Sequence, residues 1–118
     1  MPVIGNFQLA AGQAAYGGGT SAAAAAAVNV ALGFVPKYVR VINLNTSVVV
    51  TEFIHGDDDV DMGQGVQTKE SSGFSAAVLS ANGITVGDVV VDGKKVKGFT
   101  IGTACQTNSK AFMWIALG

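Results

Sequence analysis

The sequence has little charge, one cysteine and two prolines. Charged residues make up 13% of its 118 positions, against roughly 25% in ordinary soluble domains. Lys94, Lys95 and Lys97 stand close together, but Asp88 and Asp92 lie beside them. Nucleic-acid-binding proteins gather basic residues into a patch. We therefore predict that this chain binds no nucleic acid.

The single cysteine, Cys105, excludes an internal disulfide and a metal site built on cysteine pairs. We expect it to be a small, buried, apolar residue. The first ten residues, MPVIGNFQLA, lack the basic region and long apolar stretch of a secretory signal. No run approaches the ~20 apolar residues that cross a bilayer. We predict that the protein is made and stays in a reducing cytoplasm, unless it is released as part of a particle, and that it makes no membrane contact.

Apolar residues are plentiful, at 49% of the chain. A chain of this length forms one domain with one core. Few charges and many apolar residues leave more apolar surface than one small core hides. We therefore predict an oligomer or a subunit of a larger particle.

Residues 33–56, GFVPKYVRVINLNTSVVVTEFIHG, carry the clearest local signal. Pro36 fixes its own φ and favours an extended residue before it. The run 38–43 then places Val39 and Val41 on one face, with Tyr38, Arg40 and Ile42 on the other. Turn residues at 45–47 precede a second β-branched run at 48–54, which together predict a β-hairpin.

Short strand candidates continue to the C-terminus, at 66–68, 76–80, 84–86, 89–91, 94–97, 99–101 and 110–117. Asn82-Gly83 and Asp92-Gly93 are two-residue turns that favour positive φ. Turn signals every ~8–12 residues without an amphipathic helix are typical of an antiparallel sandwich or barrel. The predicted fold is all-β: a small antiparallel sandwich or barrel over residues 20–118, preceded by a flexible arm over 1–19 with a hinge at the glycines 17–19.

The alanine run at 22–27 allows two interpretations. Alanine is the best helix former, Ser21 is a capping residue and Gly33 closes a helix well. Val28, Val30 and Leu32, however, alternate at the period of a strand. We favour a strand from about Val28, with the alanines extended or coiled, and keep the helix as the alternative.

The last strand is apolar on both faces. Phe112, Trp114 and Ala116 occupy one face, and the residues between them occupy the other. Such a strand is covered either by its own chain on both sides or by a neighbouring subunit on one. The predicted interface residues come from this strand and from the arm: Phe7, Leu9, Phe112, Met113, Trp114, Ile115 and Leu117.

An acidic loop follows the hairpin, with Asp57, Asp58, Asp59 and Asp61 within five positions. The spacing begins like a calcium loop, but Met62 stands where the turn glycine belongs and Thr68 where the bidentate glutamate belongs. We predict a solvated loop without a metal or cofactor, and keep a contact with a basic patch on a partner and a weak cation site as the alternatives. His55 is the only histidine, and no serine or cysteine is placed to act with it, so we predict no enzymatic activity.

The sequence also resembles a known family. Residues 33–43, GFVPKYVRVIN, are similar to the G-F-x-P-x-x-V-x-V-x-N signature of small virion proteins of tailed bacteriophages. As in that class, an alanine-rich segment comes first, a G-F-x-I-G-T segment follows at 98–103, and an aromatic–apolar–Ala ending closes the chain at 114–116. The resemblance spans residues 20–118. After Gly102-Thr103, Ala104-Cys105 replaces the family's usual acidic or amide residue.

The resemblance implies a head decoration (cement) protein, bound to the outside of the capsid and located in the virion. Its implied partners are the major capsid protein and its own copies, in a homotrimer. The alternative is a tail or fibre component, a β-rich trimer that serves attachment or receptor binding. A carbohydrate-binding module requires an exposed aromatic platform, for which the sequence gives little support.

Overall fold

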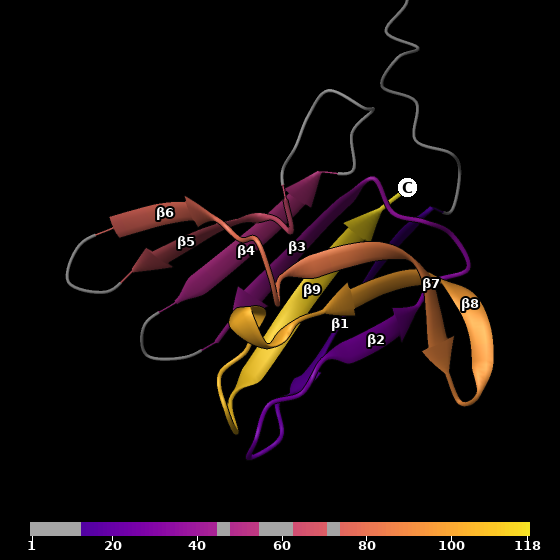
Figure 1. Ribbon diagram of the computed structural model, residues 1–118, viewed down its shortest axis with the longest axis horizontal. Helices are drawn as coiled ribbons and strands as arrows, with labels where there is room; N and C mark the ends of the chain where they lie inside the picture. The colour runs from indigo at the N-terminus through magenta and orange to yellow at the C-terminus, as the bar shows by residue number, and fades with distance from the viewer. Residues whose placement is uncertain (1–12, 45–47, 55–62, 71–73) are drawn as a thin grey trace, which may run out of the picture.

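Nine β-strands and one short 3-10 helix make up the described residues (13–44, 48–54, 63–70 and 74–118) of the computed structural model (Figure 1). No α-helix occurs in these ranges, so the all-β prediction is confirmed. The elements are β1 (Ala14–Thr20), β2 (Val28–Ala31), β3 (Tyr38–Asn43), β4 (Val49–Ile54), β5 (Val66–Glu70), β6 (Phe74–Val78), β7 (Ile84–Val91), β8 (Lys94–Ile101), η2 (Thr103–Cys105) and β9 (Ala111–Leu117).

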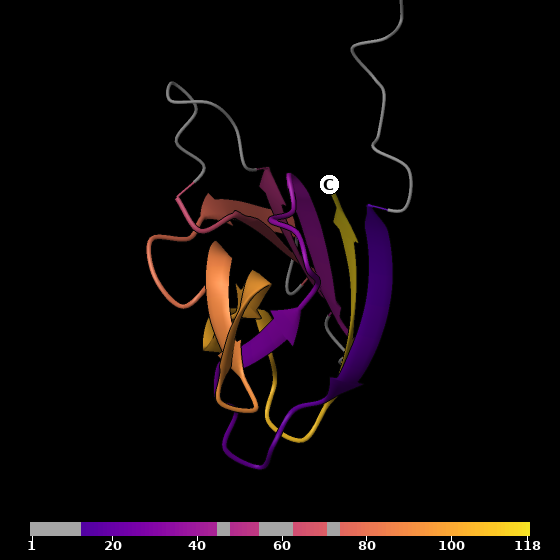
Figure 2. The ribbon, with the colours of Figure 1, turned by 90° about the vertical axis from the view of Figure 1, so that its right-hand side faces the viewer.

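The strands form two antiparallel sheets. The larger has the order β1-β9-β3-β4-β5-β6, and the smaller has the order β2-β8-β7. The smaller sheet packs on the side of the larger sheet where β1, β9 and β3 lie (Figures 1 and 2). The two sheets share no strand pairing, so the predicted sandwich is correct and the barrel alternative is wrong.

The predicted hairpin is confirmed as β3 and β4, which pair antiparallel from Tyr38↔Ile54 to Asn43↔Val49. The alternation sorts their side chains as expected, with Val39 and Val41 at 0% and 1% exposure. Asp92 and Gly93 join β7 to β8 with φ values of 52° and 77°. Both residues adopt the left-handed conformation that a type I′ hairpin turn requires, as predicted.

Asn82-Gly83 has a different role. Asn82 has the predicted positive φ, 58°, but β6 and β7 on its two sides belong to different sheets. The turn therefore carries the chain from one layer of the sandwich to the other. The Gly83 N–H donates to Oε1 of Gln64 at 2.9 Å, which ties this crossing to the start of β5.

The alanine run is not helical. Residues 22–27 have no regular structure, and β2 begins at Val28, as the favoured interpretation predicted. Val28, Val30 and Leu32 pack against the core. Burial of this alternating face outweighs the helix propensity of the alanines, because alanine methyl groups offer little apolar area for tertiary packing.

The predicted arm boundary at residue 19 is wrong. Residues 14–20 form β1, which pairs with β9 from Ala14↔Leu117 to Thr20↔Ala111. The glycine hinge is also wrong, because a Cβ on Gly17 would lie 2.7 Å from a Trp114 ring carbon. The glycines leave space for aromatic rings of β9. Residues 1–12, with Phe7 and Leu9, lie outside the described residues.

The core lies between the sheets. Phe99 and Trp114 meet edge to face at its centre, with ring centroids 5.2 Å apart. The buried cluster consists of Val39, Val41, Phe53, Ile84, Phe99, Ile101, Cys105, Phe112 and Ala116.

No helix in the described ranges is long and apolar enough to span a bilayer.

Candidate interaction surface

Strand β9 separates the residues predicted to form one interface. Phe112 is 5% exposed and lies in the core, and Trp114 packs against that core. Met113 and Ile115 point to the other side and are 51% and 44% exposed. Leu117, next to the end of the chain, is half-buried. Coverage of both faces of β9 by the chain itself does not hold among the described residues, because none of them covers Met113 and Ile115. Coverage of this side by a neighbouring subunit stays a prediction.

We call the uncovered side of the larger sheet the outer face. Its residues follow from the strand registers, since directly paired residues point to the same side. One row crosses all six strands: Tyr16, Ile115, Arg40, Glu52, Val66 and Val78. The next row contains Gly18, Met113, Ile42, Val50, Thr68 and Ala76. A shorter row contains Ala14, Leu117, Tyr38 and Ile54.

The outer face is mostly apolar, and residues from several of its strands are exposed. Besides Met113 and Ile115, the exposed fractions are 83% for Tyr16, 50% for Ile54 and 58% for Val78. Six strands spaced by about 4.8 Å span roughly 24 Å. Apolar residues scattered singly over a surface need no explanation, whereas a continuous apolar face indicates contact with another molecule.

Arg40 and Glu52 are the charged residues in these three rows, and they stand opposite each other on β3 and β4. The hydroxyl of Tyr38 donates to Oε2 of Glu52 at 2.5 Å. Burial, together with this bond to a carboxylate, raises the pKa of Tyr38 to about 12. These two charges have opposite signs, so the three rows together carry no net charge.

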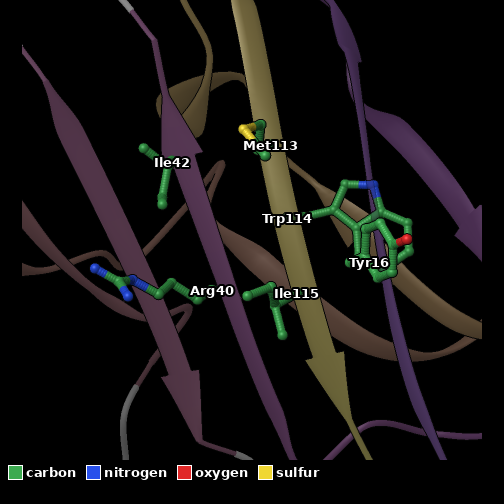
Figure 3. Close-up of a pocket in the computed structure, with 6 residues that line it drawn as sticks. All are labelled: Tyr16, Arg40, Ile42, Met113, Trp114 and Ile115. Atoms are coloured by element: carbon green, nitrogen blue, oxygen red, sulfur yellow. The ribbon is translucent and has the colours of Figure 1, made fainter.

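A shallow hollow lies on this face over β9 (Figure 3). Its volume of about 140 Å³ is below the roughly 300–1,000 Å³ of small-molecule sites. Arg40 supplies its one charged side chain. A hollow this small and open fits a side chain of a protein partner better than a free ligand. It is lined by Tyr16, Arg40, Ile42, Met113, Trp114 and Ile115.

A polar network closes the sandwich near η2 on the inner side. The amide of Gln106, which is 8% exposed, donates to the carbonyl oxygens of Ala26 and Ile101 and accepts from the Ser21 hydroxyl. The Gln67 amide donates to the Ala104 carbonyl oxygen at 2.7 Å. Each bond ties a loop or strand end to another segment, so the network is structural.

Cys105 lies in the core at 1% exposure, as predicted. Burial raises the pKa of its thiol, despite hydrogen bonds with Thr51 and Gly102 that lower it. A protonated, buried thiol is a poor nucleophile. The side chain therefore acts as packing.

The described residues contain no group of three or more His, Cys, Asp and Glu that could hold a metal ion. The acidic loop at Asp57, Asp58, Asp59 and Asp61, with His55 before it, lies outside the described residues. The contact predicted for that loop stays a prediction.

Three of the most exposed outer-face residues, Tyr16, Ile54 and Val78, were not among the interface residues predicted from the sequence. For Ile54 the sequence did contain a signal, because apolar residues occupy both alternating series of β3 and β4 and therefore both faces of the hairpin. For Tyr16 no such signal existed, because glycines follow it and its sheet position depends on pairing with β9.

Together these features define a small β-sandwich whose larger sheet has one uncovered apolar face. The chain matches no family model, and no curated protein or solved structure is significantly similar to it.

Proposed function

We propose that this protein is a structural component of a virion: a decoration protein that binds the outside of a phage capsid and stabilises the lattice. The outer face is the observation that carries the proposal. The resemblance over residues 20–118 supplies the class of particle. The proposed partners are the major capsid protein and other copies of this chain.

The composition of the outer face suits such a role. Its apolar rows gain free energy by leaving water, at about 25 cal/mol per Å² of apolar surface buried. Arg40 and Glu52, the charged residues of the three rows, have opposite signs and stand opposite each other in the strand register, so these rows bring no net charge to a partner. Weak contacts repeated over a lattice add up through tethering at many points.

A binding experiment with purified particles tests the proposal. The double variant Met113→Gln, Ile115→Gln changes two exposed outer-face residues and should lose binding to capsids that lack their own copies. Val90→Gln is the matched control, because Val90 is 58% exposed on the smaller sheet. Retained binding by the double variant, or equal loss in the control, would contradict the assignment of the outer face.

The same β-sandwich also suits a tail or fibre component. The two roles differ in copy number, because a decoration protein repeats over the capsid surface and a fibre is present a few times per particle. Quantitative mass spectrometry of purified particles, scaled to the major capsid protein, separates them. A stoichiometry of a few copies per virion would favour the tail or fibre role.

Two further predictions belong to this function. If the acidic loop meets basic residues on the capsid, attachment should weaken as salt rises, because salt screens exposed charges. Changing Asp57, Asp58, Asp59 and Asp61 to Asn should remove that salt dependence.

The homotrimer implied by the resemblance is tested by native mass spectrometry, where a monomer at all concentrations would count against it.

A further inference from the structure

We propose that β1 is an assembly strand whose outer edge pairs, antiparallel about a two-fold axis, with β1 of a second copy of this chain. The pairing would join two six-stranded sheets into one. It does not depend on the capsid assignment, because its hydrogen bonds are made by the backbone edge of the sheet.

No described residue pairs with the outer edge of β1 along its length. The strand lies at the end of the larger sheet with β9 on one side (Figure 2). The Ser21 N–H donates to the Lys110 carbonyl oxygen at 2.9 Å, and the Gly118 N–H donates to the Gln13 carbonyl oxygen at 2.7 Å. Odd-numbered positions therefore direct their backbone groups towards β9.

Backbone groups in an antiparallel strand alternate between its two sides. The even-numbered residues Ala14, Tyr16, Gly18 and Thr20 therefore direct their N–H and C=O groups away from β9. No backbone group in the described part of the chain pairs with them. The result is a row of four donors and four acceptors ready for another strand.

This edge lacks the features with which proteins protect edge strands from pairing. Protected edges carry charges, proline, bulges or very short strands. β1 has seven residues and neither charge nor proline. The two edge strands of the smaller sheet are less suited to pairing. β2 has only four residues, and Gly87 interrupts the extended backbone of β7 with a φ of 128°. β6, the other edge of the larger sheet, also lacks charge and proline but has only five residues, so β1 is the longest uninterrupted edge.

The second copy fits the edge in one register. An antiparallel pair centred on Gly17 sets Ala14 opposite Thr20 of the second copy and Tyr16 opposite Gly18 of the second copy. Shifting this register along the strand leaves some of the four outward-facing residues without a partner. The centred register therefore satisfies the most backbone groups.

The same register complements the side chains. Tyr16 is 83% exposed, and the residue it would face, Gly18, has no side chain. The ring would lie over the glycine and reach Met113, which is the β9 neighbour of Gly18. An aromatic residue across from a glycine is a stabilising pair in sheets. Within the chain, the Trp114 ring already lies against Gly17 in this way.

We expect a weak, concentration-dependent dimer. Each exposed hydrogen bond contributes little net free energy, because it replaces bonds to water, and association costs translational and rotational freedom. Two-fold pairing keeps both outer faces on the same side of the extended sheet. The dimer can therefore present both faces to one partner surface.

Sedimentation velocity over a concentration series tests the pairing. Wild type should shift from monomer to dimer as concentration rises. Tyr16→Lys, which adds an edge charge, and Thr20→Pro, which removes one outward N–H, should each weaken the dimer by at least about tenfold. Val90→Lys is the control on the other sheet and should dimerise like wild type. Unchanged melting temperatures would show that the variants are folded.

A cross-linking experiment tests the register. A mixture of Ala14→Cys and Thr20→Cys should form the mixed disulfide on oxidation, because the two residues face each other at a Cα separation near 5.5 Å. Neither variant alone should cross-link, and Cys105 is buried. Efficient self-cross-linking of either variant would overturn the register. A monomer at every concentration, or a trimer unaffected by Tyr16→Lys, would overturn the proposal.

Discussion

The two faces of the larger sheet both carry apolar residues, yet in the described part of the chain one is packed against a second sheet and the other is not. On β3, Val41 is 1% exposed on the inner side, and Ile42, the next residue, faces outward. On β9, Phe112 is buried and Met113 is half exposed. The smaller sheet covers the inner side where β9 and β3 lie, as Figures 1 and 2 show. The difference therefore lies in what packs against each face, and hydrophobicity alone does not explain it.

This comparison separates two uses of apolar residues. Burial on the inner face stabilises the chain by itself, because the same molecule supplies both sides of the contact. An exposed apolar face contributes to stability only when another molecule covers it. Substitutions on the two faces should therefore be detected by different experiments.

The largest effect should come from the centre of the inner side. Phe99 is fully buried and meets the Trp114 ring edge to face. Phe99→Ala should lower the free energy of unfolding by about 3–5 kcal/mol, measured by chemical denaturation. Val90→Ala, at an exposed position of the smaller sheet, should change it by less than about 0.5 kcal/mol. Similar losses in both variants would show that the inner side is not a fixed core.

A second test introduces a larger side chain at Gly17, a tightly packed position on the inner side of β1. Even a Cβ on Gly17 would stand 2.7 Å from the Trp114 ring. Gly17→Val should therefore destabilise the fold towards the upper end of about 1–3 kcal/mol and shift the fluorescence of Trp114, the single tryptophan. Thr20→Val, exposed on the same strand, is the control. A stable Gly17→Val variant with unchanged fluorescence would contradict the packing of β1 on β9.

The sharpest comparison uses two consecutive residues. Val41→Thr puts a hydroxyl into the core and should cost about 1–3 kcal/mol of stability. Ile42→Thr puts the same group on the outer face and should cost less than about 1 kcal/mol. Thermal unfolding of both variants measures the difference. If the order were reversed, the assignment of inner and outer faces would be wrong.

The smallest effect should be a pH dependence on the outer face. The pKa of Tyr38 rises from 10.0 to about 12 in the folded protein. Folding therefore favours the protonated phenol, and this contribution is fully present below pH 10 and is lost as pH rises towards 12. Tyr38→Phe should flatten that part of the melting-temperature profile. The Tyr16→Phe variant leaves Tyr38 as the remaining tyrosine, so absorbance titration can follow it directly.

Local sequence signals predicted much of the fold. The β3–β4 hairpin, the Asp92-Gly93 turn and the start of β2 at Val28 followed from alternation and turn chemistry, which act between near neighbours. The role of residues 14–20 could not be predicted in this way. Three glycines look flexible in isolation, and only pairing with β9, about a hundred residues later, makes them a strand.

The candidate surface shows the same division. The sequence alone established that β9 is apolar on both faces and that the chain has more apolar residues than one small core needs. It could not decide which face of β9 lies inside, because an alternating strand with two apolar faces fits either orientation. Tertiary structure made that choice: the smaller sheet covers Phe112 and Ala116, while β1 and β3 flank Met113 and Ile115 without covering them. The physical reason is that strand alternation is local, whereas burial requires a second layer from distant parts of the chain.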